Sequence, residues 1–248
     1  MRFEDKCAIV TGASRGIGRA TALAFAQEGA HLVVNGTNRT LLGELRAEIE
    51  CTGRQCIVIT GDIALPDTAR QLVDAAVSGI GRLDCLVNNA GVIQRAPTLD
   101  MTIDDWHRVL DINLTGTLHC CRAAVAVMCR QGHGKIVNVA SSASKQPHAN
   151  AAPSYGASKA GVLYLTRHLA REYAARGVNV NAVCPGPTET DMTGQWTPEY
   201  RDSVMRKIPL GRIGKPEEVA SAILFLCSEG ADFIVGEAIN VNGGTFMD

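Results

Sequence analysis

The sequence lacks a strong net charge, a signal segment and any long hydrophobic run. Its 248 residues carry a formal net charge of −1, which provides no basic field for a nucleic acid or an anionic membrane. No apolar run approaches the ~20 residues that a membrane-spanning helix needs, and no signal-peptide pattern precedes the first predicted strand. We therefore expect a cytoplasmic protein that binds neither nucleic acid nor membrane.

The spacing of the cysteines and histidines matches neither a metal site nor a disulfide framework. The nine cysteines form no C-x-x-C pair, and most lie inside apolar runs. Such cysteines are typical of small buried side chains in a reducing compartment. His119, His133 and His148 do not have the spacing of metal ligands. The sequence predicts no metal site.

No repeat, low-complexity tract or Pro/Gly/Ser-rich linker divides the chain. Hydrophobic residues make up 46% of it and charged residues 20%, which is ordinary for a soluble globular protein. An α/β domain can reach this length around one sheet. We expect a single domain over residues 1–248.

Short apolar runs alternate with longer helical patterns along the whole chain. The runs are continuously apolar, which predicts strands of a parallel sheet covered on both faces. Repeated βα units with right-handed crossovers then predict an open, doubly wound α/β sheet. The predicted strands are 7–10, 31–34, 56–59, 85–87, 136–139, 178–184 and 238–241. The predicted helices are about 17–28, 39–52, 67–79, 103–130, 154–175 and 216–228.

One region interrupts this alternation. Residues 185–209 separate the sixth predicted strand from the last predicted helix, and they include only a short helical pattern at 198–207. Long excursions inside compact domains are usually functional or mobile. We expect a substrate lid at about 187–210, with a simple surface flap as the alternative.

A glycine-rich turn follows the first predicted strand. It reads Gly12-Ala-Ser-Arg-Gly-Ile-Gly18, and a predicted helix begins within it. Glycines let the backbone turn sharply and approach a pyrophosphate, and the helix N-terminus supplies unpaired N–H groups. Because the turn lies between the first strand and the first helix, we interpret it as a nucleotide-binding motif.

Tyr155 and Lys159 are four residues apart near the start of a predicted helix, so they share one helix face. A tyrosine hydroxyl has a pKa near ~10 and exchanges protons poorly at neutral pH unless a positive charge favours the phenolate. Lys159 could supply that charge. The pair suits proton exchange with an alcohol or carbonyl oxygen.

Taken together, these motifs resemble the short-chain dehydrogenase/reductase family over the whole chain and in the family's order. The series comprises Thr11–Gly18, Asn88–Gly91, Asn113, a serine before Tyr155-x-x-x-Lys159, and Pro185-Gly186. Residues 189–192, 214–217 and 236–244 further resemble its 3-oxoacyl-[acyl-carrier-protein] reductase branch.

The resemblance implies a Rossmann-type fold with helices on both faces of about seven strands in the order 3-2-1-4-5-6-7. It implies an NAD(P)-dependent oxidoreductase that interconverts a carbonyl and a secondary alcohol by hydride transfer. A small-molecule or acyl-thioester substrate and a homotetramer, or a homodimer, are expected on the same ground.

The resemblance also implies the catalytic residues. Tyr155 would protonate the substrate oxygen, Lys159 would lower the pKa of the phenol and hold the ribose, and Asn113 would kink its helix and hold a water. The usual spacing before the tyrosine selects Ser142 as the catalytic serine. The strand register selects Ser141, which we favour because slipping a buried strand would reverse the face of every side chain.

The charges near the end of the second predicted strand bear on the choice between NAD and NADP. NAD-selective relatives carry an acidic residue at the end of the second strand, whereas this sequence has none between Asn35 and Arg39. Arg15 and Arg39 could instead meet a 2′-phosphate, so NADP(H) is expected, with NAD(H) possible. The expected cofactor-binding residues are Gly12, Ser14, Arg15, Gly16, Ile17, Gly18, Thr37, Arg39, Asp62, Ile63, Asn89, Ala90, Gly91, Tyr155, Lys159, Pro185, Gly186, Thr188 and Thr190.

Two other functions remain open. Residues 89–97 and 152–155 resemble a sugar-acid or polyol dehydrogenase, such as a gluconate- or deoxygluconate-type enzyme, and Arg95 would suit an anionic substrate. The remoter alternative is a nucleotide-binding regulatory protein without catalysis. Intact catalytic positions argue against it.

Overall fold

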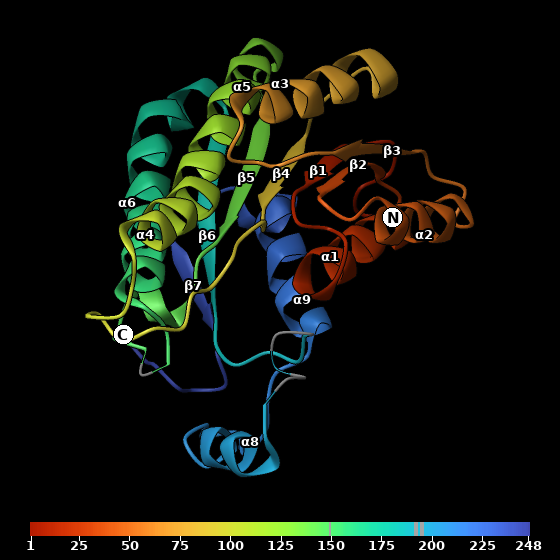
Figure 1. Ribbon diagram of the computed structural model, residues 1–248. Helices are drawn as coiled ribbons and strands as arrows, with labels where there is room; N and C mark the ends of the chain where they lie inside the picture. Colours follow the sequence, from red (N-terminus) through yellow and green to blue (C-terminus); the bar gives the residue numbers. More distant parts are fainter. Residues whose placement is uncertain (149, 191–192, 194–195) are drawn as a thin grey trace.

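Seven parallel strands form one sheet in the order β3-β2-β1-β4-β5-β6-β7, as predicted (Figure 1). The computed structural model describes residues 1–148, 150–190, 193 and 196–248. The strands are β1 (Cys7–Val10), β2 (His31–Gly36), β3 (Cys56–Thr60), β4 (Cys85–Asn88), β5 (Gly134–Val139), β6 (Val178–Pro185) and β7 (Ala238–Val241).

Helices cover both faces of the sheet and begin at recognisable signals. Asn38 and Thr102 cap α2 and α4 by accepting hydrogen bonds from the N–H groups of Leu41 and Asp105, and prolines occupy the first turns of α3, α6, α8 and α9. The helices are α1 (Gly16–Gln27), α2 (Arg39–Glu50), α3 (Pro66–Ala75), α4 (Ile103–Leu110), α5 (Gly116–Gln131), α6 (Pro153–Tyr173), α8 (Pro198–Met205) and α9 (Pro216–Cys227).

Alternate residues of each central strand enter two separate cores. On β1, Ala8 and Val10 pack into the core beneath α1, α2 and α9, whereas Cys7 and Ile9 pack into the core that contains α3 and α5. Figure 1 shows α1 and α9 on one side of the sheet and α4, α5 and α6 on the other. Because helices cover both faces, the central strands are mostly apolar, and Asn35, Asn88 and Asn138 are buried polar residues near their ends.

The longest helix contains a widened turn. Residues 103–131 form one continuous helix in which Asp111–Thr115 is a π turn between α4 and α5. In the described part of the chain, this is the one helix with the length and apolar composition of a membrane span. Since 56% of its most apolar window is buried inside the protein, it has the character of a core helix.

Candidate active site

The glycine-rich turn lies between β1 and α1, and its backbone requires glycine at two positions. Gly12 and Gly16 have φ angles of +62° and +56°, a region that side chains with a Cβ rarely adopt. A Cβ on Gly12 would also lie 2.7 Å from the Cα of Ala90. The turn is therefore closely packed against the segment that follows β4.

This turn fits the phosphates of a dinucleotide. Arg15 at the N-cap of α1 has no acceptor atom with which to satisfy the first N–H groups of the helix. These groups and the positive end of the helix dipole favour an anion. A Cβ on Gly16 would lie 3.0 Å from the methyl group of Thr190, so Thr190 stands beside the same turn.

The segment after β4 braces the turn. The hydroxyl of Thr11 accepts hydrogen bonds from the N–H groups of Asn89 and Ala90, both at 3.0 Å. The carboxamide of Asn89 in turn donates to the carbonyls of Thr11 and Gly12, both at 3.0 Å. The side chain of Asn89 therefore shapes the nucleotide turn from within.

The end of β2 lies next to the same turn. A Cβ on Gly36 would overlap the hydroxyl of Ser14, and Thr37 and Arg39 are exposed just beyond it. The Asn35 side chain is buried and donates to the carbonyls of Ile59 and Gly61 at 3.0 and 3.1 Å. The predicted selectivity residues therefore follow the carboxyl ends of β1 and β2.

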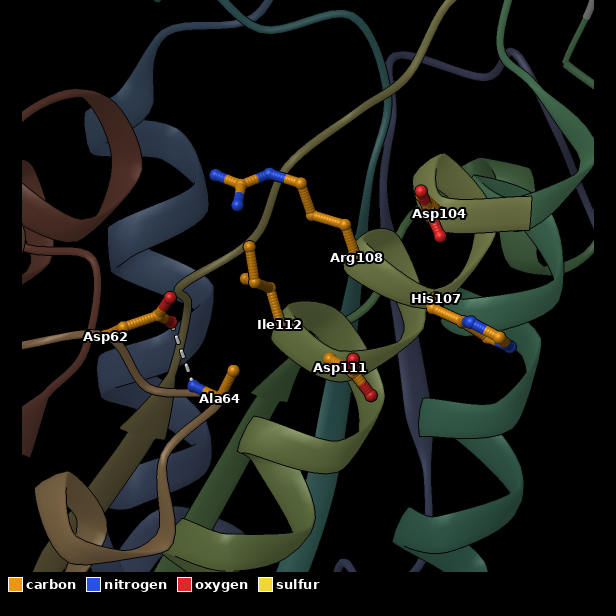
Figure 2. A pocket seen from close by; sticks show the side chains of 7 residues that line it. All are labelled: Asp62, Ala64, Asp104, His107, Arg108, Asp111 and Ile112. Carbon is orange, nitrogen blue, oxygen red and sulfur yellow. Dashed lines mark hydrogen bonds between the residues drawn. The ribbon is translucent and has the colours of Figure 1, made fainter. Parts of the chain in front are cut away.

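A hollow of about 280 Å³ lies between the loop after β3 and α4 (Figure 2). Asp62 lines it, and its carboxylate accepts a hydrogen bond from the N–H of Ala64 at 3.0 Å. Ile63 is buried in the core instead, so its side chain is not on this surface. Arg108 and Ile112 also line the hollow, and their i, i+4 spacing was the signal that could have identified them.

Tyr155 and Lys159 occupy the first turns of α6, and the structure brings Ser141 to them. Burial raises the pKa of the Tyr155 phenol, and a hydrogen bond with Ser141 acts in the opposite direction. Ser141 also accepts from the N–H of Ala143 at 3.1 Å. Ser142 begins the short helical turn that follows. Of the two candidate serines, Ser141 is the one that contacts the tyrosine.

The buried ammonium of Lys159 donates to the carbonyl of Val139 at 2.7 Å. Burial lowers the pKa of Lys159 to about 8, with a smaller opposing effect from Cys184. We expected Lys159 to lower the pKa of Tyr155, but in this structure the pKa of Tyr155 is raised. The reason is that loss of hydration destabilises the phenolate more than its neighbours stabilise it.

Asn113 lies fully buried in the π turn. Its side-chain oxygen accepts from the N–H of Val92 at 2.8 Å, and its nitrogen donates to the Val92 carbonyl at 2.9 Å and to the Ser158 hydroxyl at 3.0 Å. A Cβ on Gly91 would lie 3.2 Å from Asn113 Oδ1 and 3.3 Å from Lys159 Nζ. Asn113 thus joins three segments beside Lys159.

The segment after β6 completes this end of the sheet. Gly186 donates its N–H to Val241 at 3.1 Å, and the Thr188 hydroxyl donates to the carbonyl of Gly186 at 3.0 Å. Thr188 also forms an isolated parallel β-bridge with Gly214. Of the predicted segment 189–192, Asp191 and Met192 lie outside the described residues.

A larger hollow of about 690 Å³ adjoins the start of α6. Its walls come from the loop after β4, the residues before Tyr155 and the segment that leads into α8, and they include Arg95, Thr98, Pro153, Trp196 and Tyr200. The loop is tied to α6 because the N–H of Ala152 donates to the carbonyl of Gln94 at 2.8 Å. The predicted lid region therefore borders a cavity.

Comparison with known proteins agrees with this geometry. The family model described as enoyl-(acyl carrier protein) reductase matches residues 12–245. A 3-oxoacyl-[acyl-carrier-protein] reductase of Synechocystis sp. is 43% identical over 97% of this chain and 96% of its own. The enzyme of the same name from Thermotoga maritima is 39% identical, over 98% and 99%.

Solved structures are similar over nearly the whole fold. A putative short-chain alcohol dehydrogenase from Sinorhizobium meliloti has a TM-score of 0.93 and 38% identity, covering 99% of this chain and 98% of that one. A putative gluconate dehydrogenase from Agrobacterium tumefaciens has a TM-score of 0.93 and 33% identity, covering 98% and 96%.

The fold is a seven-stranded doubly wound sheet with a glycine turn after β1. Ser141 after β5, Tyr155 and Lys159 at the start of α6 and Asn113 in the π turn form the group of a nicotinamide-dependent oxidoreductase. The chain belongs to the short-chain dehydrogenase/reductase family.

Proposed function

We propose that the protein is an NADP(H)-preferring carbonyl reductase whose substrate is a 3-oxoacyl thioester. The observation that carries the proposal is the contact of Ser141 with Tyr155 one helical turn from Lys159. The names of the curated relatives from Synechocystis and Thermotoga maritima support the thioester. We also propose that the protein is cytoplasmic and forms a homotetramer or a homodimer.

The nicotinamide, when bound, supplies the hydride for the carbonyl carbon. Tyr155 donates the proton to the oxygen, and its raised pKa keeps that proton in place at neutral pH. Ser141 hydrogen-bonds the same oxygen and stabilises the charge that develops on it. Lys159 would hold the ribose hydroxyls, since its ammonium lies buried against Gly91 beside the nucleotide turn.

Cofactor preference rests on the end of β2. Thr37 and Arg39 are exposed there, no acidic residue lies between Asn35 and Arg39, and Arg15 belongs to the adjacent turn. A 2′-phosphate would meet positive rather than negative charge. The residues from 187 to 210 would act as the lid, because Trp196 and Tyr200 line the larger hollow.

A sugar-acid or polyol dehydrogenase is the second candidate. The gluconate dehydrogenase similarity and the guanidinium of Arg95 in the wall of the larger hollow favour it. Turnover of an acetoacetyl thioester, compared with turnover of hexonates and polyols, separates the two functions.

Replacing Tyr155 with Phe tests the chemistry itself. The variant keeps the ring and loses the proton, so we expect kcat to fall by at least about 100-fold, while NADPH titration shows binding within about twofold of wild type. The measurement is the loss of nicotinamide absorbance with acetoacetyl thioester as substrate. Unchanged turnover in Tyr155→Phe would remove Tyr155 as the proton donor, whereas a wild type that turns over no carbonyl substrate would favour the regulatory alternative.

A further inference from the structure

Arg95 is the one charged side chain among the described residues that line the larger hollow. It lies in the loop after β4, and the neighbouring hydrogen bond from Ala152 N–H to the Gln94 carbonyl, at 2.8 Å, fixes that loop against the start of α6. Tyr155 follows Ala152 by three residues. The guanidinium and the proton donor are therefore presented by two segments that are held together.

The positive charge of Arg95 is not neutralised within the part of the chain that the structure describes. No described carboxylate forms an ion pair with it. Burial and the charge of Arg95 both lower the pKa of His148, in that order. Both effects favour the neutral form of His148.

Two aromatic side chains also line the hollow. Trp196 and Tyr200 pack edge to face, with ring centroids 5.1 Å apart and an interplanar angle of 82°. The indole N–H of Trp196 is buried and has no hydrogen-bond partner among the described residues. A buried donor without an acceptor is costly unless a ligand supplies one.

We propose that Arg95 selects substrates that carry an anionic oxygen group, a carboxylate or a phosphate, at a distance from the reacting carbonyl. The guanidinium would bind that group through paired N–H donors, and the aromatic wall would pack against the chain between the anion and the carbonyl. This inference rests on the proposed reductase function and adds the chemical class of the substrate to it.

Two sources of that anion are distinguished by choice of substrate. Acetoacetyl-coenzyme A carries phosphates on its carrier, and acetoacetyl-N-acetylcysteamine has the same reacting group without charge. A six-carbon oxo-acid and the neutral ketose of equal length form the second pair. Each is measured with wild type, Arg95→Met, Arg95→Lys and the control Arg70→Met, whose side chain lies on α3 and is 65% exposed.

We expect Arg95→Met to reduce kcat/KM for one anionic substrate by about tenfold to a hundredfold, through KM, because hydrogen bonds to charged groups contribute that much. The matched neutral substrate should change by less than about twofold. Arg95→Lys should recover part of the loss, and Arg70→Met should behave as wild type. The substrate pair that shows the effect identifies the anion as phosphate or carboxylate.

Equal losses on the charged and neutral members of both pairs, or no loss on either charged member, would overturn the inference. Melting temperatures of all variants within a few degrees of wild type establish that the comparison is between folded proteins. If wild type reduces the neutral thioester or ketose but the effect of Arg95→Met does not depend on the charge of the substrate, only this inference fails. If wild type reduces none of the four carbonyls, the proposed reductase function fails.

Discussion

Replacing Lys159 with Met should make the protein more stable while abolishing its activity. The side chain of Lys159 is buried, and burial lowers its pKa from 10.5 to about 8. At 1.36 kcal/mol per pKa unit, holding the ammonium charged in this position costs about 3 kcal/mol at pH 7. Methionine removes the charge and keeps the length of the chain. Loss of the hydrogen bond from the charged ammonium to Val139 offsets about 2 kcal/mol, so we expect a net gain of about 1 kcal/mol.

The effect has a definite dependence on pH. The folded pKa of Lys159 is lowered, so between about pH 8 and the unfolded value of 10.5 the unfolded wild type binds more protons than the folded one. Wild-type stability therefore rises with pH in that window. Lys159→Met lacks this rise, and its advantage should shrink by about 1 kcal/mol between pH 7 and pH 9.

Urea denaturation at pH 7 and pH 9 measures both quantities. The control is Lys207→Met, which removes an exposed lysine and should change stability by less than about 0.5 kcal/mol at either pH. Lys159→Met should show no turnover with any carbonyl substrate. A variant less stable than wild type at pH 7, or an advantage that does not fall with pH, would refute the reasoning that Lys159 is held at an energetic cost for its function.

Two further substitutions separate the assignments made here. Ser141→Ala should reduce kcat about 100-fold, since it removes the hydrogen bond that opposes the raised pKa of Tyr155. Ser142→Ala should keep kcat within about threefold of wild type. A larger loss of kcat in Ser142→Ala than in Ser141→Ala would identify Ser142 as the catalytic serine. Thr37→Asp should weaken NADPH binding by about tenfold or more through charge repulsion, and it should leave NADH binding much less affected. Titration of each cofactor measures both effects, and the control Thr52→Asp should change neither. Equal weakening of NADPH and NADH binding would contradict the charge argument.

Much of the fold follows from local patterns in the sequence. The continuously apolar runs correctly predicted all seven strands, because each central strand feeds two buried faces. The order of the strands came from the family resemblance, and the structure confirms it. The ends were less predictable: β2 continues through Asn35 and Gly36, because Asn35 finds buried acceptors at Ile59 and Gly61 that no local pattern reveals.

The site was predictable where a motif fixes its geometry and not where tertiary contacts do. The glycine turn was predictable because it lies between the first strand and the first helix, and the Tyr155–Lys159 pair because residues four apart share a helix face and the other motifs accompany them. Without the family resemblance, Asn113 would have been interpreted as a surface residue, yet its side chain is fully buried because Val92 and Ser158 supply its partners from distant parts of the chain. The hydrogen bond from Lys159 to Val139 depends on such packing too.

The π turn at Asp111–Thr115 sets the phase of the long helix. Buried residues recur at every fourth position, Val109, Asn113, Thr117, Cys121 and Val125, and a regular helix overshoots a full rotation by about 40° for each such step. Four steps would carry the stripe about 160° around the axis, and one inserted residue absorbs about 100° of that. The one residue inserted between Val109 and Val125 therefore allows the same side of the helix to face the hydrophobic interior and to present Asn113 to the candidate active site.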